Sequence, residues 1–155
     1  MLLQSPKDPK SGPPEGAREP TTIRPGHWLS SVLIIDDKTA EAASVAARLH
    51  LLLGYDIRIE HAKGLGRALD FLQKDCAPNL IMLDDVLPPT DRAPSSIAFL
   101  RRAGYHGPII VVGGLLTTAI IGAARAAGAI DVIHKDDLDT ARLLDAIGKL
   151  TPPRS

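Results

Sequence analysis

The stretch LIMLDD at residues 80–85 joins four apolar residues to two adjacent aspartates. The pattern occurs a second time at residues 31–37, where SVLIIDD ends in Asp36 and Asp37. A short continuous apolar run is typical of a strand that is buried on both faces, as strands are in a parallel sheet. Each stretch therefore predicts a buried strand whose carboxyl end carries two carboxylates.

Apolar runs alternate with helical patterns throughout residues 31–150. We expect strands at 31–35, 56–60, 80–83, 108–112 and 130–133. Apolar residues at helical spacing, several of them followed by a glycine, predict helices at 38–53, 64–74, 95–103, 115–127 and 138–149. Five strands alternating with five helices indicate an α/β fold, in which helices cover both faces of a parallel sheet.

The two ends of the chain differ in composition from this central region. Residues 1–30 hold six of the 13 prolines and almost no apolar clusters, so we expect a disordered tail there. A second short tail is expected at 151–155, because Pro152 and Pro153 cannot continue the last helix. A single domain at 31–150 follows from these boundaries.

The overall composition excludes several classes of protein. The 155 residues include 18 basic and 18 acidic ones and only 3% aromatics, which argues against binding nucleic acid by bulk charge or base stacking. One cysteine excludes an intrachain disulfide and a four-cysteine zinc site. The chain start has no signal-peptide pattern, and the longest apolar stretch, 115–130, is too short to span a bilayer. We therefore expect a cytoplasmic protein that binds neither nucleic acid nor membrane.

Charged residues follow three of the expected strands. Parallel strands present their carboxyl ends at one edge of the sheet, which brings together Asp36, Asp37, Asp84, Asp85 and Lys135. Several carboxylates in one place repel each other unless a cation neutralises them, and Mg²⁺ prefers oxygen ligands. A metal ion and an ammonium beside a nucleophilic carboxylate suit phosphoryl transfer. The sequence therefore predicts a Mg²⁺-dependent site that forms an aspartyl phosphate.

These motifs together resemble the receiver domain of bacterial response regulators. The resemblance rests on Asp36-Asp37 after the first strand, on LIMLD at 80–84 followed by Pro88, and on Lys135 after the fifth strand. It covers all of 31–150 and implies a flavodoxin-like (βα)5 three-layer sandwich with strand order 2-1-3-4-5. It also implies a stand-alone response regulator, not an enzyme acting on separate substrates, that signals by protein–protein contact.

The resemblance gives each site residue a role. It implies that Asp84 accepts a phosphoryl group from a histidine kinase or a histidine phosphotransfer protein. Asp37, Asp84 and the backbone carbonyl of Val86 would bind Mg²⁺ directly, and Asp36 would act through water. Lys135 would pair with Asp84 and then with its phosphoryl oxygens.

Two positions depart from the family's pattern. The residue that ends the fourth strand is usually Ser or Thr, but here it is Gly113, which has no hydroxyl to bond the phosphoryl group. The switch position of the fifth strand, usually aromatic, is Val132. We therefore expect an intact phosphoacceptor with an altered switch. The alternative is a pseudo-receiver that binds its partner independently of phosphorylation.

The apolar helix expected at 115–127 indicates a contact surface. Its core face is expected to comprise Leu116, Ile120, Ala123 and Ala127. Three apolar residues would then lie nearer the solvent, namely Leu115, Ala119 and Ile121. An exposed apolar patch of this kind marks an interaction surface, so we expect a homodimer or a partner to bind there.

Three polar residues near the expected site receive structural interpretations. We expect Asp85 to be a loop or ion-pair residue, because neighbouring side chains of an extended chain point in opposite directions. His61 and His134 are expected at the surface or in packing contacts, since no histidine or cysteine spacing indicates a zinc site.

Overall fold

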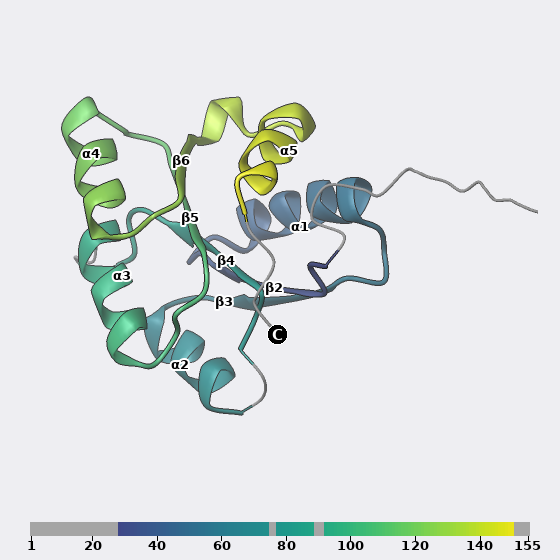
Figure 1. Ribbon diagram of the computed structural model, residues 1–155, viewed down its shortest axis with the longest axis horizontal. Coiled ribbons are helices and arrows are strands. Elements are labelled where there is room, and N and C mark those ends of the chain that lie inside the picture. The colour runs from purple at the N-terminus through teal and green to yellow at the C-terminus, as the bar shows by residue number, and fades with distance from the viewer. Residues whose placement is uncertain (1–27, 75–76, 89–91, 151–155) are drawn as a thin grey trace, which may run out of the picture.

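The computed structural model describes residues 28–74, 77–88 and 92–150 (Figure 1). Its strands are β2 (Ser31–Ile35), β3 (Arg58–Ala62), β4 (Leu80–Asp84), β5 (Ile109–Gly113) and β6 (Asp131–His134). Its α-helices are α1 (Thr39–Leu53), α2 (Leu65–Lys74), α3 (Ala93–Arg102), α4 (Thr118–Ala127) and α5 (Thr140–Gly148). A 3-10 turn, η1 (Lys135–Asp137), precedes α5. The alternation of strands and helices expected from the sequence is confirmed.

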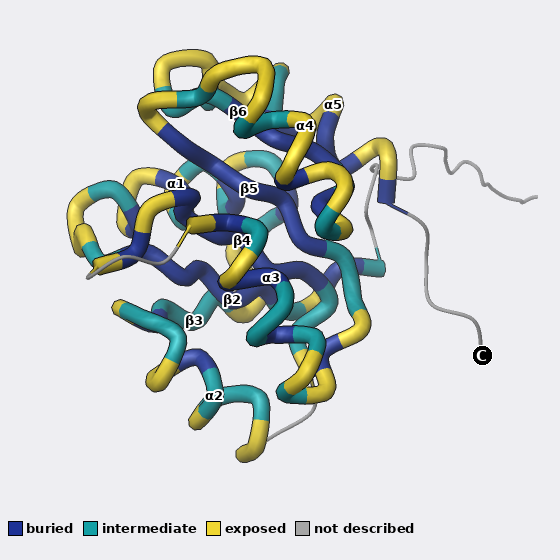
Figure 2. The backbone as a smooth tube through the Cα atoms, turned by 90° about the vertical axis from the view of Figure 1, so that its left-hand side faces the viewer, coloured by how far each residue is buried: buried dark blue, intermediate teal, exposed yellow. Residues whose placement is uncertain are grey.

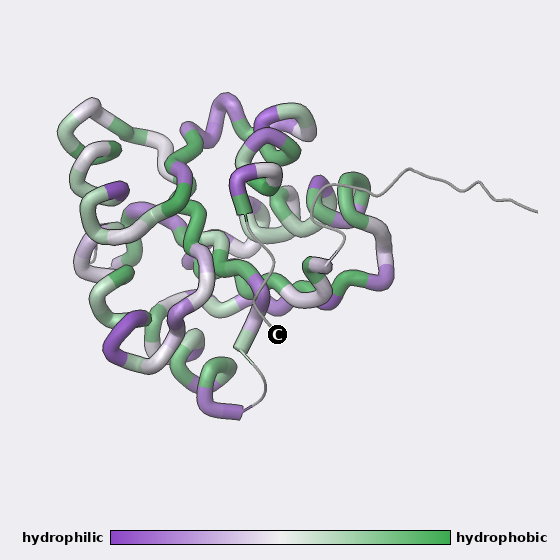
Figure 3. Tube along the Cα trace, viewed as in Figure 1, coloured by the Kyte–Doolittle hydropathy of each residue, from purple (hydrophilic) through white to green (hydrophobic). Residues whose placement is uncertain are grey.

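The strands form one parallel sheet in the order β3-β2-β4-β5-β6. In chain order this is 2-1-3-4-5, so the flavodoxin-like fold class is confirmed. β4 and β5 are buried at every residue, as their continuous apolar runs predict (Figure 2). The apolar segments concentrate in these central strands, and polar segments lie mainly on helices and loops (Figure 3).

The sheet separates two apolar clusters. Helices α1 and α5 cover one face, and α2, α3 and α4 cover the other (Figure 1). Successive residues of each strand face opposite sides, so Ile34 and Met82 pack toward α1 and α5 while Ile35 and Leu83 pack toward the other helices. Both faces of the sheet are thereby removed from water, which is the main stabilisation of such a sandwich.

The ends of the chain lie largely outside the described residues. Of the tails expected at 1–30 and 151–155, only residues 28–30 are described, so the domain boundaries stay a prediction. Leu29 is buried and Trp28 packs against the cluster under α1 and α5. Within the described residues, no helix has the length and apolar character needed to cross a membrane.

Some element boundaries differ from those expected. The second strand covers Arg58–Ala62, not 56–60, because Arg58 N–H donates to the carbonyl of Ser30 and the pairing with β2 begins there. The fourth helix begins at Thr118, not at residue 115, because the Thr117 hydroxyl oxygen accepts a hydrogen bond from Ile120 N–H at 3.2 Å and caps the helix.

The face that α4 turns to the core also differs. Ala124 is fully buried, and Ile121 and Ala127 pack against the same cluster, whereas Ala123 is exposed. The expectation that Ala123 lies inward and Ile121 outward is therefore wrong. Turning Ile121 inward removes more apolar area from water than turning Ala123 inward would. Leu115 and Ala119 are exposed, as expected.

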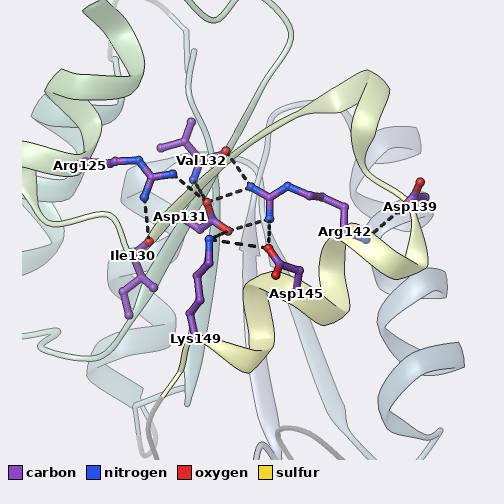
Figure 4. A network of polar contacts seen from close by, with 8 residues as sticks. All are labelled: Arg125, Ile130, Asp131, Val132, Asp139, Arg142, Asp145 and Lys149. Atoms are coloured by element: carbon purple, nitrogen blue, oxygen red, sulfur yellow. Dashed lines mark hydrogen bonds and ion pairs between the residues drawn. The ribbon is translucent and has the colours of Figure 1, made fainter. Parts of the chain in front are cut away.

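A buried carboxylate joins β6 to α4 and α5 (Figure 4). Asp131 has no exposed surface, and it accepts hydrogen bonds from Arg142 Nη1 at 2.7 Å, Lys149 Nζ at 3.0 Å and Arg125 Nη2 at 3.1 Å. Its Oδ1 also accepts from Val132 N–H at 2.9 Å. Burial acts to raise the pKa of Asp131, but the hydrogen bonds from Arg142 and Lys149 outweigh it and hold that pKa well below 3.8.

Loss of the Asp131 charge should destabilise the domain. We expect Asp131→Asn to lower the free energy of unfolding by about 2–3 kcal/mol in urea titrations at neutral pH. Asp145→Asn is the matched control, because Asp145 contacts the same Arg142 and Lys149 but its side chain is 63% exposed. The control should lower the free energy of unfolding by less than about 0.5 kcal/mol. Equal losses in the two variants would contradict a special stabilising role of the buried Asp131.

The same comparison has a defined pH dependence. The folded pKa of Asp131 lies below its ordinary value, so its stabilisation is complete at neutral pH and is lost as the pH falls through the acidic range. The difference in the free energy of unfolding between wild type and Asp131→Asn should therefore become smaller below about pH 4.

Candidate functional site

Three carboxylates meet at the carboxyl edge of the central strands. Asp36, Asp37 and Asp84 each offer an oxygen within 4.8 Å of the others. β2 and β4 are paired with Ile35 beside Leu83, so Asp36, just after β2, lies next to Asp84, the last residue of β4. Both are nearly inaccessible to solvent, at 5% and 4% exposure. The sequence prediction that these aspartates gather is confirmed.

Backbone contacts fix the position of Asp36. Its Oδ1 accepts a hydrogen bond from Lys38 N–H at 2.8 Å, which closes the turn that leads into α1. Its carbonyl oxygen lies 2.7 Å from His61 Nε2. His61 thus makes a packing contact at the edge of the site, as expected, and it supplies no atom to the carboxylate cluster.

The ammonium of Lys135 lies between two carboxylates. Its Nζ is 3.5 Å from Asp84 Oδ1 and donates a hydrogen bond to Glu41 Oε1. The expected pairing of Lys135 with Asp84 is present as an ion pair. Glu41, in the first turn of α1, was not predicted as a site residue, although it follows Asp37 by only four residues.

The Asp84 carboxyl group is only partly compensated. Burial and the neighbouring Asp36 carboxylate raise the pKa of Asp84 to about 6, although Lys135 and Lys38 act to lower it. Its Oδ2 is buried and has no hydrogen-bond partner among the described residues. Strong perturbation of a buried carboxyl group at a sheet edge is typical of a functional site.

The donor set of the site fits a hard divalent cation. All three side chains offer oxygen, and the unpartnered Asp84 Oδ2 leaves room for a ligand bond. Asp36, Asp37 and Asp84 could therefore hold Mg²⁺. Val86 follows Asp84 by two residues, and its side chain is 45% exposed.

Asp85 has a separate, structural role. Its carboxylate accepts hydrogen bonds from Arg92 Nη2 at 2.7 Å and from Ala93 N–H at 3.1 Å. It is thus the ion-pair residue that we expected. It is also 1% exposed and binds the first backbone N–H of α3, so it ties the end of β4 to that helix.

The space beside Gly113 is filled. A Cβ atom at this position would lie 2.8 Å from Leu116 Cδ2 and 3.1 Å from Asp85 Cβ, closer than carbon atoms normally approach. A side chain at this position would therefore require the end of the Leu116 side chain to move. Val132, at the other expected switch position, is 6% exposed and belongs to the apolar cluster under α2, α3 and α4.

Comparisons of sequence give no match: no protein-family model matches the chain, and no curated protein matches it significantly. Solved structures do match. The beryllofluoride-activated NtrC4 receiver domain dimer has a TM-score of 0.66 at 24% identity, covering 77% of this chain and 93% of that one. The signal receiver domain of a putative Luxo repressor protein from Vibrio parahaemolyticus has a TM-score of 0.64 at 20% identity, covering 81% and 88%.

A third structure agrees with these two. The response regulator receiver protein from Pseudoalteromonas atlantica has a TM-score of 0.62 at 17% identity, covering 76% of this chain and 93% of that one. Together the likenesses show that the chain has the receiver-domain fold.

Removing the charge of Asp84 should stabilise the metal-free protein. Its folded pKa of about 6 lies above the ordinary 3.8, so ionised Asp84 costs the folded state up to about 3 kcal/mol at pH 7.5. We expect Asp84→Asn to raise the free energy of unfolding by about 1–3 kcal/mol at pH 7.5 in a chelator. The gain should shrink at pH 5, where folded wild type is largely protonated; a gain independent of pH would contradict this explanation.

A side chain at Gly113 should conflict with Leu116. We expect Gly113→Ala to lower the free energy of unfolding by about 1–2 kcal/mol in urea titrations. The double variant with Leu116→Ala should cost about 1 kcal/mol less than the sum of the single variants. Gly114→Ala is the control, because its nearest neighbour would be Lys135 Cδ at an ordinary 3.9 Å. Additive single costs would show that Leu116 does not restrict this position.

Proposed function

We propose that this chain accepts a phosphoryl group on Asp84 and passes the signal on by protein–protein contact. The donor would be a histidine kinase or a histidine phosphotransfer protein. The observation that carries the proposal is the buried Asp84, which lies between the Asp36 and Asp37 carboxylates and the Lys135 ammonium and whose Oδ2 has no partner in the part of the chain that the structure describes. The receiver-domain fold supports the same reading.

The chemistry follows from these groups. An oxygen of the Asp84 carboxylate attacks the phosphorus of a phosphohistidine, the new P–O bond forms and the P–N bond breaks. The imidazole nitrogen keeps the electron pair of that bond and takes a proton from solvent. The raised pKa makes Asp84 a stronger base than an ordinary aspartate, and it is still ionised above about pH 6. Hydrolysis later returns the carboxylate and releases inorganic phosphate.

Each of the other site residues has a proposed part. Asp36, Asp37, Asp84 and the Val86 carbonyl would hold Mg²⁺, which when bound neutralises charge on the phosphoryl oxygens. Lys135 would donate hydrogen bonds to the same oxygens. The reaction is confined to Asp84 itself, so the proposed role is in cytoplasmic signalling and not in turnover of a separate substrate.

Partner contact is proposed at α4. Its exposed side carries small apolar residues, and Leu115, just before the helix, is 83% exposed. A surface with so few charges suits a homodimer or a partner protein. Gly113 and Val132 occupy the expected switch positions, so the signal would leave the site without a hydroxyl or an aromatic ring at those places.

One set of observations favours a second candidate, a pseudo-receiver. Leu116 fills the space next to Gly113, and Val132 is packed in the core, so neither position carries a side chain that could reorient toward Asp84. Under this alternative the chain binds its partner equally well with and without an acyl-phosphate mimic.

Phosphorylation at Asp84 is tested directly. Incubation with acetyl phosphate and Mg²⁺ should add one phosphoryl group to wild type, as measured by intact mass, and none to Asp84→Asn. Asp136→Asn is the control, because Asp136 follows Lys135 but its side chain is 90% exposed. We expect it to be labelled like wild type. Unchanged labelling of Asp84→Asn would contradict the proposed acceptor.

A further inference from the structure

The hydrogen bond of Lys135 is made to Glu41 and not to Asp84. The Lys135 ammonium donates to Glu41 Oε1, while its distance to Asp84 Oδ1 is 3.5 Å. The two carboxylates reach it from different elements, α1 and β4, and Lys135 itself follows β6. The Glu41 side chain is 40% exposed and that of Asp84 is 3% exposed. The ammonium that forms an ion pair with the buried Asp84 is therefore hydrogen-bonded to a more exposed carboxylate, that of Glu41.

We infer that Glu41 competes with the phosphorylated Asp84 for Lys135 and thereby weakens the hold of the site on a phosphoryl group. The inference rests on the proposed function, since it concerns the state in which Asp84 carries that group. Glu41 acts through Lys135, so it is a positioning residue.

The surroundings of Asp84 make the competition matter. Gly113 offers no side-chain donor, and the other nearby ammonium, that of Lys38, lies 3.4 Å from Asp37 Oδ1. Among the described residues, Lys135 is the only cation in an ion pair with Asp84. While Lys135 donates a hydrogen bond to Glu41, it cannot donate that same hydrogen bond to the phosphoryl oxygens.

Charge repulsion acts in the same direction. A phosphoryl group on Asp84 brings nearly two negative charges to a place that already holds three aspartates. Glu41 adds a further negative charge, on the other side of the Lys135 ammonium from Asp84. Neutralising Glu41 removes this repulsion and frees a donor of Lys135, so both effects favour the anion.

Loss of Glu41 has opposite effects on anion binding under competition and under a simple supporting role. If Glu41 only oriented Lys135 toward the phosphoryl group, its loss would weaken anion binding. Under competition, its loss strengthens anion binding and does not strengthen Mg²⁺ binding, because a cation gains nothing from the removal of a negative charge nearby. General loosening of the site would weaken both.

The test uses the full chain and beryllofluoride, a mimic of the phosphoryl group. Affinity for beryllofluoride is measured by fluorine NMR titration in saturating Mg²⁺, and affinity for Mg²⁺ alone is measured separately by calorimetry. We expect Glu41→Gln to bind beryllofluoride about 5–10-fold more tightly than wild type, with Mg²⁺ affinity unchanged or up to about twofold weaker. Glu41→Asp keeps the charge and should stay within about twofold of wild type.

The control is Asp70→Asn. Asp70 is exposed on α2, on the other face of the sheet, so its neutralisation changes the net charge equally without touching the site. Equal or weaker beryllofluoride binding by Glu41→Gln, or the same gain in Asp70→Asn, would overturn the inference alone. A wild-type chain that binds no beryllofluoride in Mg²⁺ would overturn the proposed function and the inference with it.

Discussion

The parallel pairing of β2 with β4 is the constraint on which the site depends. It places Asp36 and Asp84 side by side at the carboxyl ends of these two strands, and an Asp37 oxygen lies within 4.8 Å of both. Their mutual repulsion and burial are costs that the fold must carry, because the strands that create them also form the centre of both apolar clusters. The cost appears as the pKa of Asp84, raised to about 6. An ionised carboxylate that is destabilised in this way is stabilised most by a bound cation or by protonation.

Asp131 shows the opposite solution in the same sheet. It is as buried as Asp84, but two arginines and a lysine donate hydrogen bonds to it, and its pKa is well below the ordinary value. A carboxylate with so many partners is inert and fastens β6 to α4 and α5 (Figure 4). Within the described ranges, Asp84 has one ion pair, with the Lys135 ammonium that also binds Glu41, and an oxygen without a hydrogen-bond partner. Asp131 and Asp84 thus differ in the number of hydrogen-bond donors around them, and the small number around Asp84 suits the role that we propose for it.

The sequence predicted what depends on periodicity and spacing along the chain. Apolar runs followed by aspartates located β2, β4 and three of the site residues, because a strand end fixes where the next side chain goes. It did not predict contacts between distant segments. Glu41 and Lys135 are 94 residues apart, and their hydrogen bond depends on how α1 packs beside η1. Asp131 stood within an apolar strand, and its three cations come from α4, from α5 and from the residue that follows α5, whose placement the sequence left open. The predicted inward face of α4 was also wrong. Small apolar residues lie on several sides of this helix, so its periodic pattern is weak.

The end of β4 lies close to the segments that lead into α3 and α4. Asp84 pairs with Val112 in the sheet, and Gly113 is the next residue of β5. Gly113 is closely surrounded by Leu116, which packs with α4, and by Asp85, which binds the first turn of α3. If Asp84 is phosphorylated as we propose, these contacts offer a route from the site to α3 and α4 that needs neither a hydroxyl nor an aromatic ring at the switch positions.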